Sequence, residues 1–98
     1  MRDPIILEQV KASLAELVRL SPGRAIEVRI PPYAAVQCGD GPTHTRGTPP
    51  NVIEMDAKTW LALANGEKQW ADAMAEGLIV ASGTRADLTQ LLPLRMTP

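Results

Sequence analysis

The chain has 98 residues, of which 45% are hydrophobic and 21% are charged, and its formal net charge at pH 7 is -1. These values are typical of one soluble globular domain, which at this length builds a single core with room for only a modest cavity. The arginines are spread along the chain. A nucleic-acid groove or a polybasic membrane patch needs clustered positive charge, so the composition excludes both.

The composition also predicts a compartment. Cys38 is the single cysteine and can form no internal disulfide, and we find no charged and apolar stretch of the kind that makes a secretion signal. No apolar run approaches the ~20 residues that cross a bilayer. We therefore expect a cytoplasmic protein without membrane insertion.

The first predicted element is an amphipathic helix over residues 4–20. Asp3 stands where an N-cap is expected, and Pro4 occupies the first helical position, where its missing N–H group costs nothing. Apolar residues then recur at helical spacing, namely Leu7, Val10, Leu14, Leu17 and Val18. A Ser-Pro-Gly sequence ends the helix at residues 21–23.

After this helix the apolar period changes from 3.6 to 2. Ile26, Val28 and Ile30 alternate with charged residues, which predicts a half-buried strand and a sheet with one face in water. Two prolines end the strand, because proline cannot donate to a ladder of hydrogen bonds. A second strand is predicted over residues 33–38.

Turn residues separate the next two predicted strands. The sequence Gly-Asp-Gly-Pro at residues 39–42 predicts a turn, followed by a short third strand over residues 43–46 in an antiparallel meander. Residues 47–50 break the chain again. A fourth strand is predicted over residues 51–55.

The second half of the chain is predicted to begin with two short helices. Asp56 caps a helix that runs to about Ala64, and Asn-Gly at residues 65–66 supplies a left-handed end. The second helix is predicted over residues 68–76 and ends at Gly77.

A fifth strand is predicted over residues 78–82. Residues 84–87 then have the spacing of a capping box, which predicts a last short helix that carries Leu88, Leu91 and Leu92 and ends at Pro93. The order of these elements predicts an α+β domain.

The stretch TWLALANGEKQWADAMAEGLIVASGTRADLTQLL resembles the C-terminal half of the sterol carrier protein family. That family has an apolar helix ending in Gly, an Ala seven residues later, a Gly four residues after that, an alternating strand, and a Gly six residues further on. Gly66, Ala73, Gly77 and Gly83 match these places. The stretches PPYAAVQ and RGTPPN resemble the small stand-alone bacterial branch of the family.

The resemblance implies a five-stranded, mostly antiparallel sheet covered on one face by helices. It also implies non-enzymatic binding of an apolar small molecule, an acyl chain or a sterol-like compound, between the sheet and the helices. No cofactor is expected.

The pocket that this implies would have a strand as its floor, the tryptophans and Met74 as its roof, and residues 88–92 as a movable side. The predicted lining consists of Ile26, Val28, Ile30, Trp60, Leu63, Trp70, Met74, Val80, Leu88, Leu91 and Leu92. The same side chains at helical spacing would also form a filled core, and the sequence leaves both possibilities open.

A filled core would favour a different function, that of a protein-interaction or accessory module. Such a module would contact a protein partner, an enzyme, through the surface formed by PPYAAVQ and RGTPPN. Whether a cavity for several methylene groups exists decides between the two functions.

Two other kinds of site are not favoured. Cys38, Asp40 and His44 have the residue types of a thiol catalyst, but the sequence gives them no further support. One Cys and one His cannot fill a zinc site, and GDGPTHTRGTPPN lacks the pattern of a phosphate-binding loop.

Overall fold

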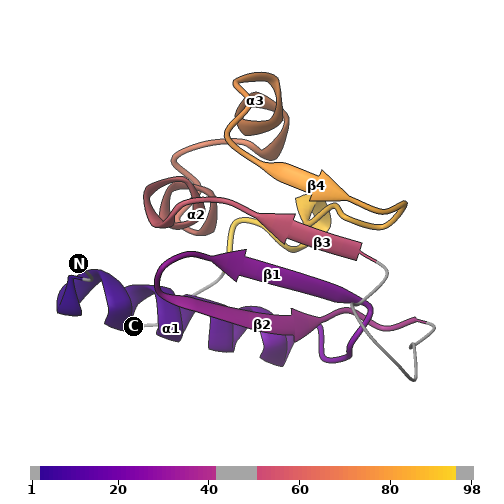
Figure 1. Ribbon diagram of the computed structural model, residues 1–98, viewed down its shortest axis with the longest axis horizontal. Helices are drawn as coiled ribbons and strands as arrows, with labels where there is room; N and C mark the ends of the chain where they lie inside the picture. Colours follow the sequence, from indigo (N-terminus) through magenta and orange to yellow (C-terminus); the bar gives the residue numbers. More distant parts are fainter. Residues whose placement is uncertain (1–2, 42–50, 95–98) are drawn as a thin grey trace.

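A computed structural model of the protein describes residues 3–41 and 51–94. In these residues the chain folds as an α+β domain, as the sequence predicts (Figure 1). Its elements in chain order are α1 (Pro4–Leu20), β1 (Ile26–Ile30), β2 (Ala34–Cys38), β3 (Asn51–Glu54), α2 (Ala57–Ala64), α3 (Trp70–Ala75), β4 (Val80–Ser82) and the 3-10 helix η1 (Thr89–Leu91).

The sheet has the strand order β2-β1-β3-β4. β1 pairs antiparallel with β2 and parallel with β3, and β4 pairs antiparallel with β3, so the sheet is mostly antiparallel as expected. The expected count of five strands is not met, because the described part of the chain forms four; the strand expected over residues 43–46 lies outside the described residues. Since β3 lies beside β1 rather than beside β2, a crossover connects the two halves of the sheet.

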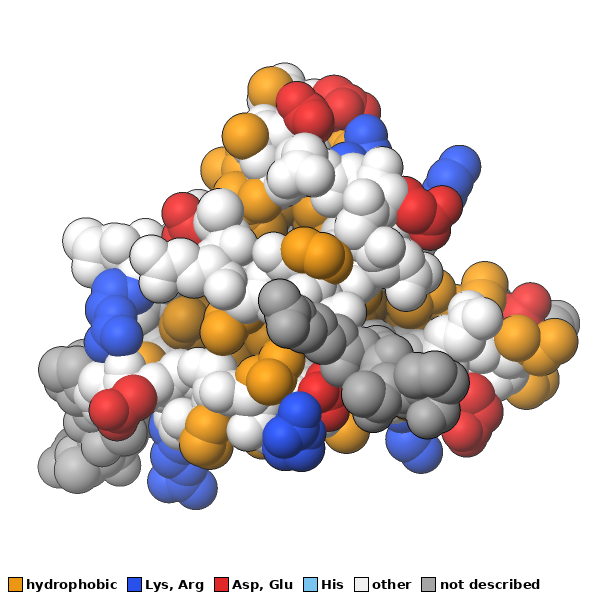
Figure 2. Space-filling model, turned by 180° about the vertical axis from the view of Figure 1, so that it is seen from behind, with side chains coloured by type: hydrophobic (Ala, Val, Ile, Leu, Met, Phe, Trp, Pro, Cys, Tyr) orange, Lys and Arg blue, Asp and Glu red, His pale blue; other side chains and the backbone are white. Residues whose placement is uncertain are grey.

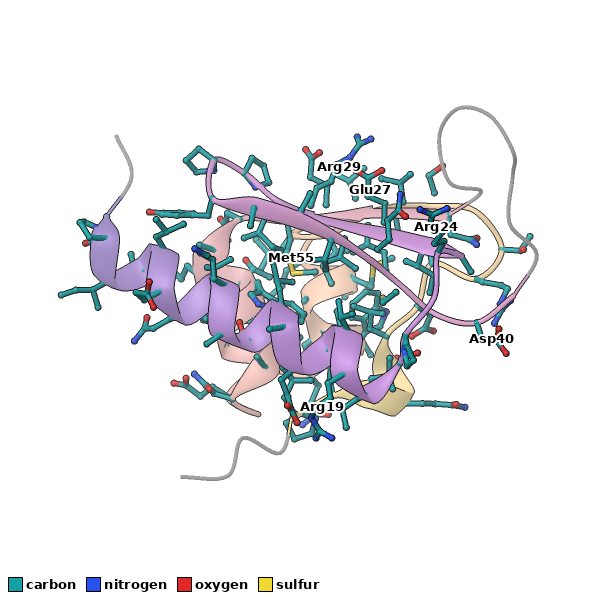
Figure 3. The ribbon with its side chains drawn as sticks, turned by 90° about the horizontal axis from the view of Figure 1, so that it is seen from below. Arg19, Arg24, Glu27, Arg29, Asp40 and Met55 are labelled. Carbon is teal, nitrogen blue, oxygen red and sulfur yellow. The ribbon has the colours of Figure 1, made fainter. Side chains whose placement is uncertain are left out.

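One face of the sheet packs on the helices and the other is open. In β1, Val28 and Ile30 are fully buried and Ile26 is 6% exposed, whereas the charged residues between them are only half-buried. Figure 3 shows Glu27 and Arg29 on the side of the strands opposite α1, and Met55 between the sheet and the helices. The alternation predicted from the sequence therefore places the open face correctly.

The core is organised around Trp60 of α2, which is fully buried. Its indole Nε1 donates a hydrogen bond of 2.8 Å to the Oγ of Ser13, a buried residue of α1. This bond satisfies the one polar atom of the tryptophan side chain and joins the two longest helices across the core.

Side chains cap the N-termini of α1 and α2 as the sequence predicts. The Asp3 carboxylate accepts hydrogen bonds from the backbone N–H groups of Ile5 and Ile6, and the Asp56 carboxylate accepts one of 2.8 Å from Thr59. The Thr59 hydrogen bonds favour the charged form of Asp56 and hold its pKa below its ordinary value.

The region after α3 differs most from the sequence-based prediction. The strand expected over residues 78–82 begins only at Val80, and no α-helix follows it within the described residues. The Asp87 carboxylate accepts from both the N–H and the hydroxyl group of Thr89, a local bond that competes with helix formation. Residues 84–94 are therefore an irregular segment with one 3-10 turn, which we call the C-terminal cover.

Candidate functional site

The structure separates the residues that were predicted to line a pocket. Several are core residues with 9% exposure or less, and these are Ile26, Val28, Ile30, Trp60, Leu63, Trp70 and Leu88. Leu91 and Leu92 of the C-terminal cover are partly buried and pack against this core. Met74 and Val80 lie at the surface, 42% and 67% exposed.

The positions of Met74 and Val80 follow from their elements. On α3 the buried side chains are Trp70 and Ala73, so Met74 points away from the core. In β4, Val80 pairs with Glu54 and therefore shares the open face, while Ala81 pairs with the buried Ile53. Figure 2 shows hydrophobic side chains at the top of the molecule, over α3.

The C-terminal cover is fixed to the body of the protein at its two ends. The backbone N–H of Arg85 donates a 2.8 Å hydrogen bond to Asn51 Oδ1, and the backbone N–H of Leu94 donates a 3.0 Å bond to the carbonyl of Ala64. Between these bonds the cover inserts Leu88, which is fully buried. Residues 88–92, which the sequence predicts as a movable side of the pocket, thus form a short irregular segment in which Leu88 is the leucine buried in the core.

A sizeable hollow lies on one side of this cover. It has a volume of about 650 Å³. It is lined by Ser21, Ile26, Gly39, Asp40, Arg85, Asp87, Thr89, Gln90 and Leu91, from the end of α1, the start of β1, the end of β2 and the cover. We call it the polar-rimmed cavity, because charged and amide side chains surround the apolar Ile26 and Leu91.

A much smaller crevice of about 30 Å³ lies on the other side of the cover. It is lined by Leu63, Gly66, Lys68, Gln69, Trp70, Thr89, Leu92 and Pro93. Thr89 contributes to both hollows, so the 3-10 turn is the wall between them. The predicted pocket residues that line a hollow are thereby divided into two groups.

Sequence reasoning missed most of the residues around the polar-rimmed cavity. Arg85, Thr89 and Gln90 were assigned to a helix that does not form, and Asp40 was considered only as a partner of Cys38. The signal that could have indicated them is topological. The turns that follow α1, β2 and β4 meet at one end of the sheet, as Asn51 shows by bonding the backbone of both Ala25 and Arg85.

Nothing in the described residues favours thiol or metal chemistry. Cys38 is fully buried, and burial raises the pKa of its thiol to about 11, which keeps it protonated at neutral pH. His44, its proposed partner, lies outside the described residues. No group of three His, Cys, Asp or Glu side chains there could hold a metal ion.

A third hollow, of about 360 Å³, lies on the open face of the sheet. It is lined by Arg29, Pro31, Pro32, Tyr33, Ala34, Ala35 and Glu54. It therefore contains the start of the PPYAAVQ stretch, whereas nearly all of the RGTPPN stretch lies outside the described residues. Its wide opening makes it a surface feature rather than a binding cavity.

None of the helices in the described part of the chain combines the length and the apolar character of a membrane span.

Two comparisons with known proteins bear on the family of this chain. No curated protein is significantly similar to the chain. A family model described as bacterial SCP ortholog, where SCP stands for sterol carrier protein, matches residues 3–94. The resemblance found in the sequence is therefore confirmed, and the chain belongs to the bacterial branch of the sterol carrier protein family.

Proposed function

We propose that the protein binds and carries a single apolar chain, such as an acyl chain, without performing chemistry on it. Membership of the sterol carrier protein family supports lipid carriage in general terms. The observation that carries the proposal is the C-terminal cover, which lies over the core and divides two hollows that share Thr89. The ligand would lie where Leu88 now packs.

The cover has little regular secondary structure to hold it in place. It has no α-helix of its own, and its three-residue η1 turn carries a single internal bond, from the Leu91 N–H to the Leu88 carbonyl. Its remaining attachments are the burial of Leu88 and Leu94, the packing of Ala86, Leu91 and Leu92 against the core, and the two terminal hydrogen bonds. Segments with few backbone hydrogen bonds open at low free energy, so an apolar chain can exchange places with Leu88.

The size of the polar-rimmed cavity suits this ligand. Its volume of about 650 Å³ lies within the ~300–1,000 Å³ of small-molecule sites. Burying ~10 methylene groups at ~0.8 kcal/mol each contributes about 8 kcal/mol, and association costs ~4 kcal/mol or more. The difference of about 4 kcal/mol corresponds to a Kd of about 1 mM, so we expect weak, promiscuous binding of a bare chain.

Tryptophan emission tests the proposal. Trp70 lines the crevice beside Leu92, whereas Trp60 is fully buried and bonded to Ser13. We expect fatty acids with 12 to 16 carbon atoms to shift the emission and to compete with one another. The variant Trp70→Phe should lose most of the shift, and the matched variant Tyr33→Phe, at a residue that lines neither hollow beside the cover, should keep it.

The opposite result would favour the second candidate function. If saturating fatty acid changes neither the emission nor the thermal midpoint, a lipid carrier is excluded. The hollow around Pro31, Pro32 and Tyr33 would then support a module that contacts an enzyme through its open face. Either function is proposed for the cytoplasm, because the one cysteine is a buried free thiol.

A further inference from the structure

The charged residues around the polar-rimmed cavity favour a particular head group on the ligand. This inference depends on the proposed function. We propose that Arg85 makes this cavity selective for chains that end in a singly charged anionic group, such as the carboxylate of a fatty acid. The apolar chain would run past Ile26 and Leu91 into the core, and the carboxylate would stay at the rim.

The backbone of Arg85 is held in place from the core. Its N–H donates to Oδ1 of Asn51, which is 3% exposed, and Nδ2 of Asn51 donates a 2.9 Å bond to the carbonyl of Ala25. A buried amide that uses both its ends in this way is a rigid support. The arginine therefore starts from a fixed point at the cavity wall, although its side chain lies on the exposed surface.

The side chain of Arg85 lies beside the backbone of Gly41. Gly41 has φ +154°, and a Cβ placed on it would collide with Nη1 of Arg85. The same added Cβ would be 3.4 Å from the side chain of Ala25. The guanidinium of Arg85 therefore lies directly against the backbone of Gly41, a position that a larger residue would make it leave.

The chain itself provides Arg85 with no carboxylate partner among the described residues. All eleven acidic side chains lie there, and the ion pairs formed are Arg19–Glu16, Arg29–Glu27 and Lys68–Glu76. Asp40 and Asp87 line the same cavity, yet neither carboxylate lies within 4.0 Å of the Arg85 guanidinium. The carboxylate of Asp87 instead accepts two hydrogen bonds from Thr89.

These charges favour an anion with one charge. A planar guanidinium binds a carboxylate through two parallel hydrogen bonds, which gives both affinity and orientation. The carboxylates of Asp40 and Asp87 repel a phosphate, which carries nearly two charges at neutral pH, more than they repel a carboxylate. A neutral head group would lose the charge-assisted bonds to Arg85 altogether.

Binding of dodecanoate and dodecanol, both below the concentrations at which they aggregate, tests the proposal by calorimetry. We expect dodecanoate to bind about tenfold more tightly, and Arg85→Gln to reduce this ratio to about one without changing the affinity for dodecanol. Arg24→Gln is the matched control, because Arg24 is exposed and does not line the cavity. It should keep the ratio, which separates a specific contact from general attraction of an anion.

Three outcomes would overturn the inference. They are an unchanged ratio in Arg85→Gln, an equal loss in Arg24→Gln, and tighter binding of dodecylamine than of dodecanoate, which would mean that Asp40 and Asp87 govern the site. Arg85→Lys, which keeps the charge but not the planar group, should lose part of the ratio and shows whether geometry matters. If neither dodecanoate nor dodecanol binds, the proposed function itself fails, a result distinct from these three.

Discussion

Single polar residues connect the sheet to the segment that covers it. Asn51 is the first residue of β3 and is 3% exposed, yet its amide bonds the loop before β1 on one side and the C-terminal cover on the other. An unsatisfied buried amide would cost roughly 1–3 kcal/mol, so these bonds also specify how the three segments meet. The Ser13–Trp60 bond has the same role between α1 and α2.

At Gly77 the backbone conformation, and not a lack of space, favours glycine. Its φ is +72°, and a Cβ placed on it would meet no atom within 4 Å. We therefore expect Gly77→Ala to lower the free energy of unfolding by about 1 kcal/mol and Gly77→Val to lower it further, since a β-branched side chain resists this conformation more strongly. Urea denaturation measures both changes. If the two variants were as stable as the parent, the turn after α3 would not require a left-handed residue.

At the scale of elements, the helices and strands that could be predicted are those with a regular pattern and a cap. The bounds of α1 agree with the sequence because an aspartate, a proline and a full apolar stripe all indicate the same helix. The C-terminal cover could not be predicted in this way. Its leucines repeat as on a helix, but the bonds from Thr89 to Asp87 decide the local conformation, and no pattern of apolar residues reveals that choice.

The candidate site was predictable only in its apolar part. The burial of Ile26, Val28 and Ile30 follows from the alternation in β1 and that of Trp60 and Leu63 from the stripe on α2, while Val80, expected in the pocket, lies on the open face of the sheet. A three-residue strand is too short for its alternation to define a face, so the pairing with Glu54 decides it. The rim of the cavity is formed by turns that the strand order brings together, and the periodicity of apolar residues does not predict such contacts.

Shortening Leu88 in the cover should lower the stability of the protein and raise its affinity for fatty acids. Leu88→Ala removes a fully buried side chain and should destabilise the protein by about 2–5 kcal/mol. If a ligand must displace Leu88, the same variant should bind fatty acids severalfold more tightly, because less packing is lost on binding. Thermal unfolding and a fluorescence titration measure the two effects.

A core leucine away from the cover provides the control for this prediction. Leu14 of α1 is 1% exposed and lines neither hollow beside the cover. Leu14→Ala should therefore destabilise the protein by a similar amount without a gain in affinity. An equal gain in both variants would attribute tighter binding to a generally loosened core and not to the cover.

On the scale of the whole molecule, the fold separates two surfaces that serve the two candidate functions. The helices and the cover enclose the core on one face of the sheet, and the open face presents the Glu27–Arg29 ion pair, with Glu54 beside Arg29 (Figure 3). A carrier uses the first surface and an interaction module the second. The same molecule can be tested for both in one experiment, because each surface has its own methyl groups.

Methyl NMR spectra recorded during a titration with dodecanoate make that test. A carrier that places its ligand under the C-terminal cover predicts concentration-dependent shifts at Ile26, Leu88 and Leu91, with the methyl groups of Val80 on the open face unchanged. Shifts confined to Val80 and its neighbours, or no shifts at any concentration of the monomeric fatty acid, would contradict the proposal that the chain is carried in the core beneath this cover.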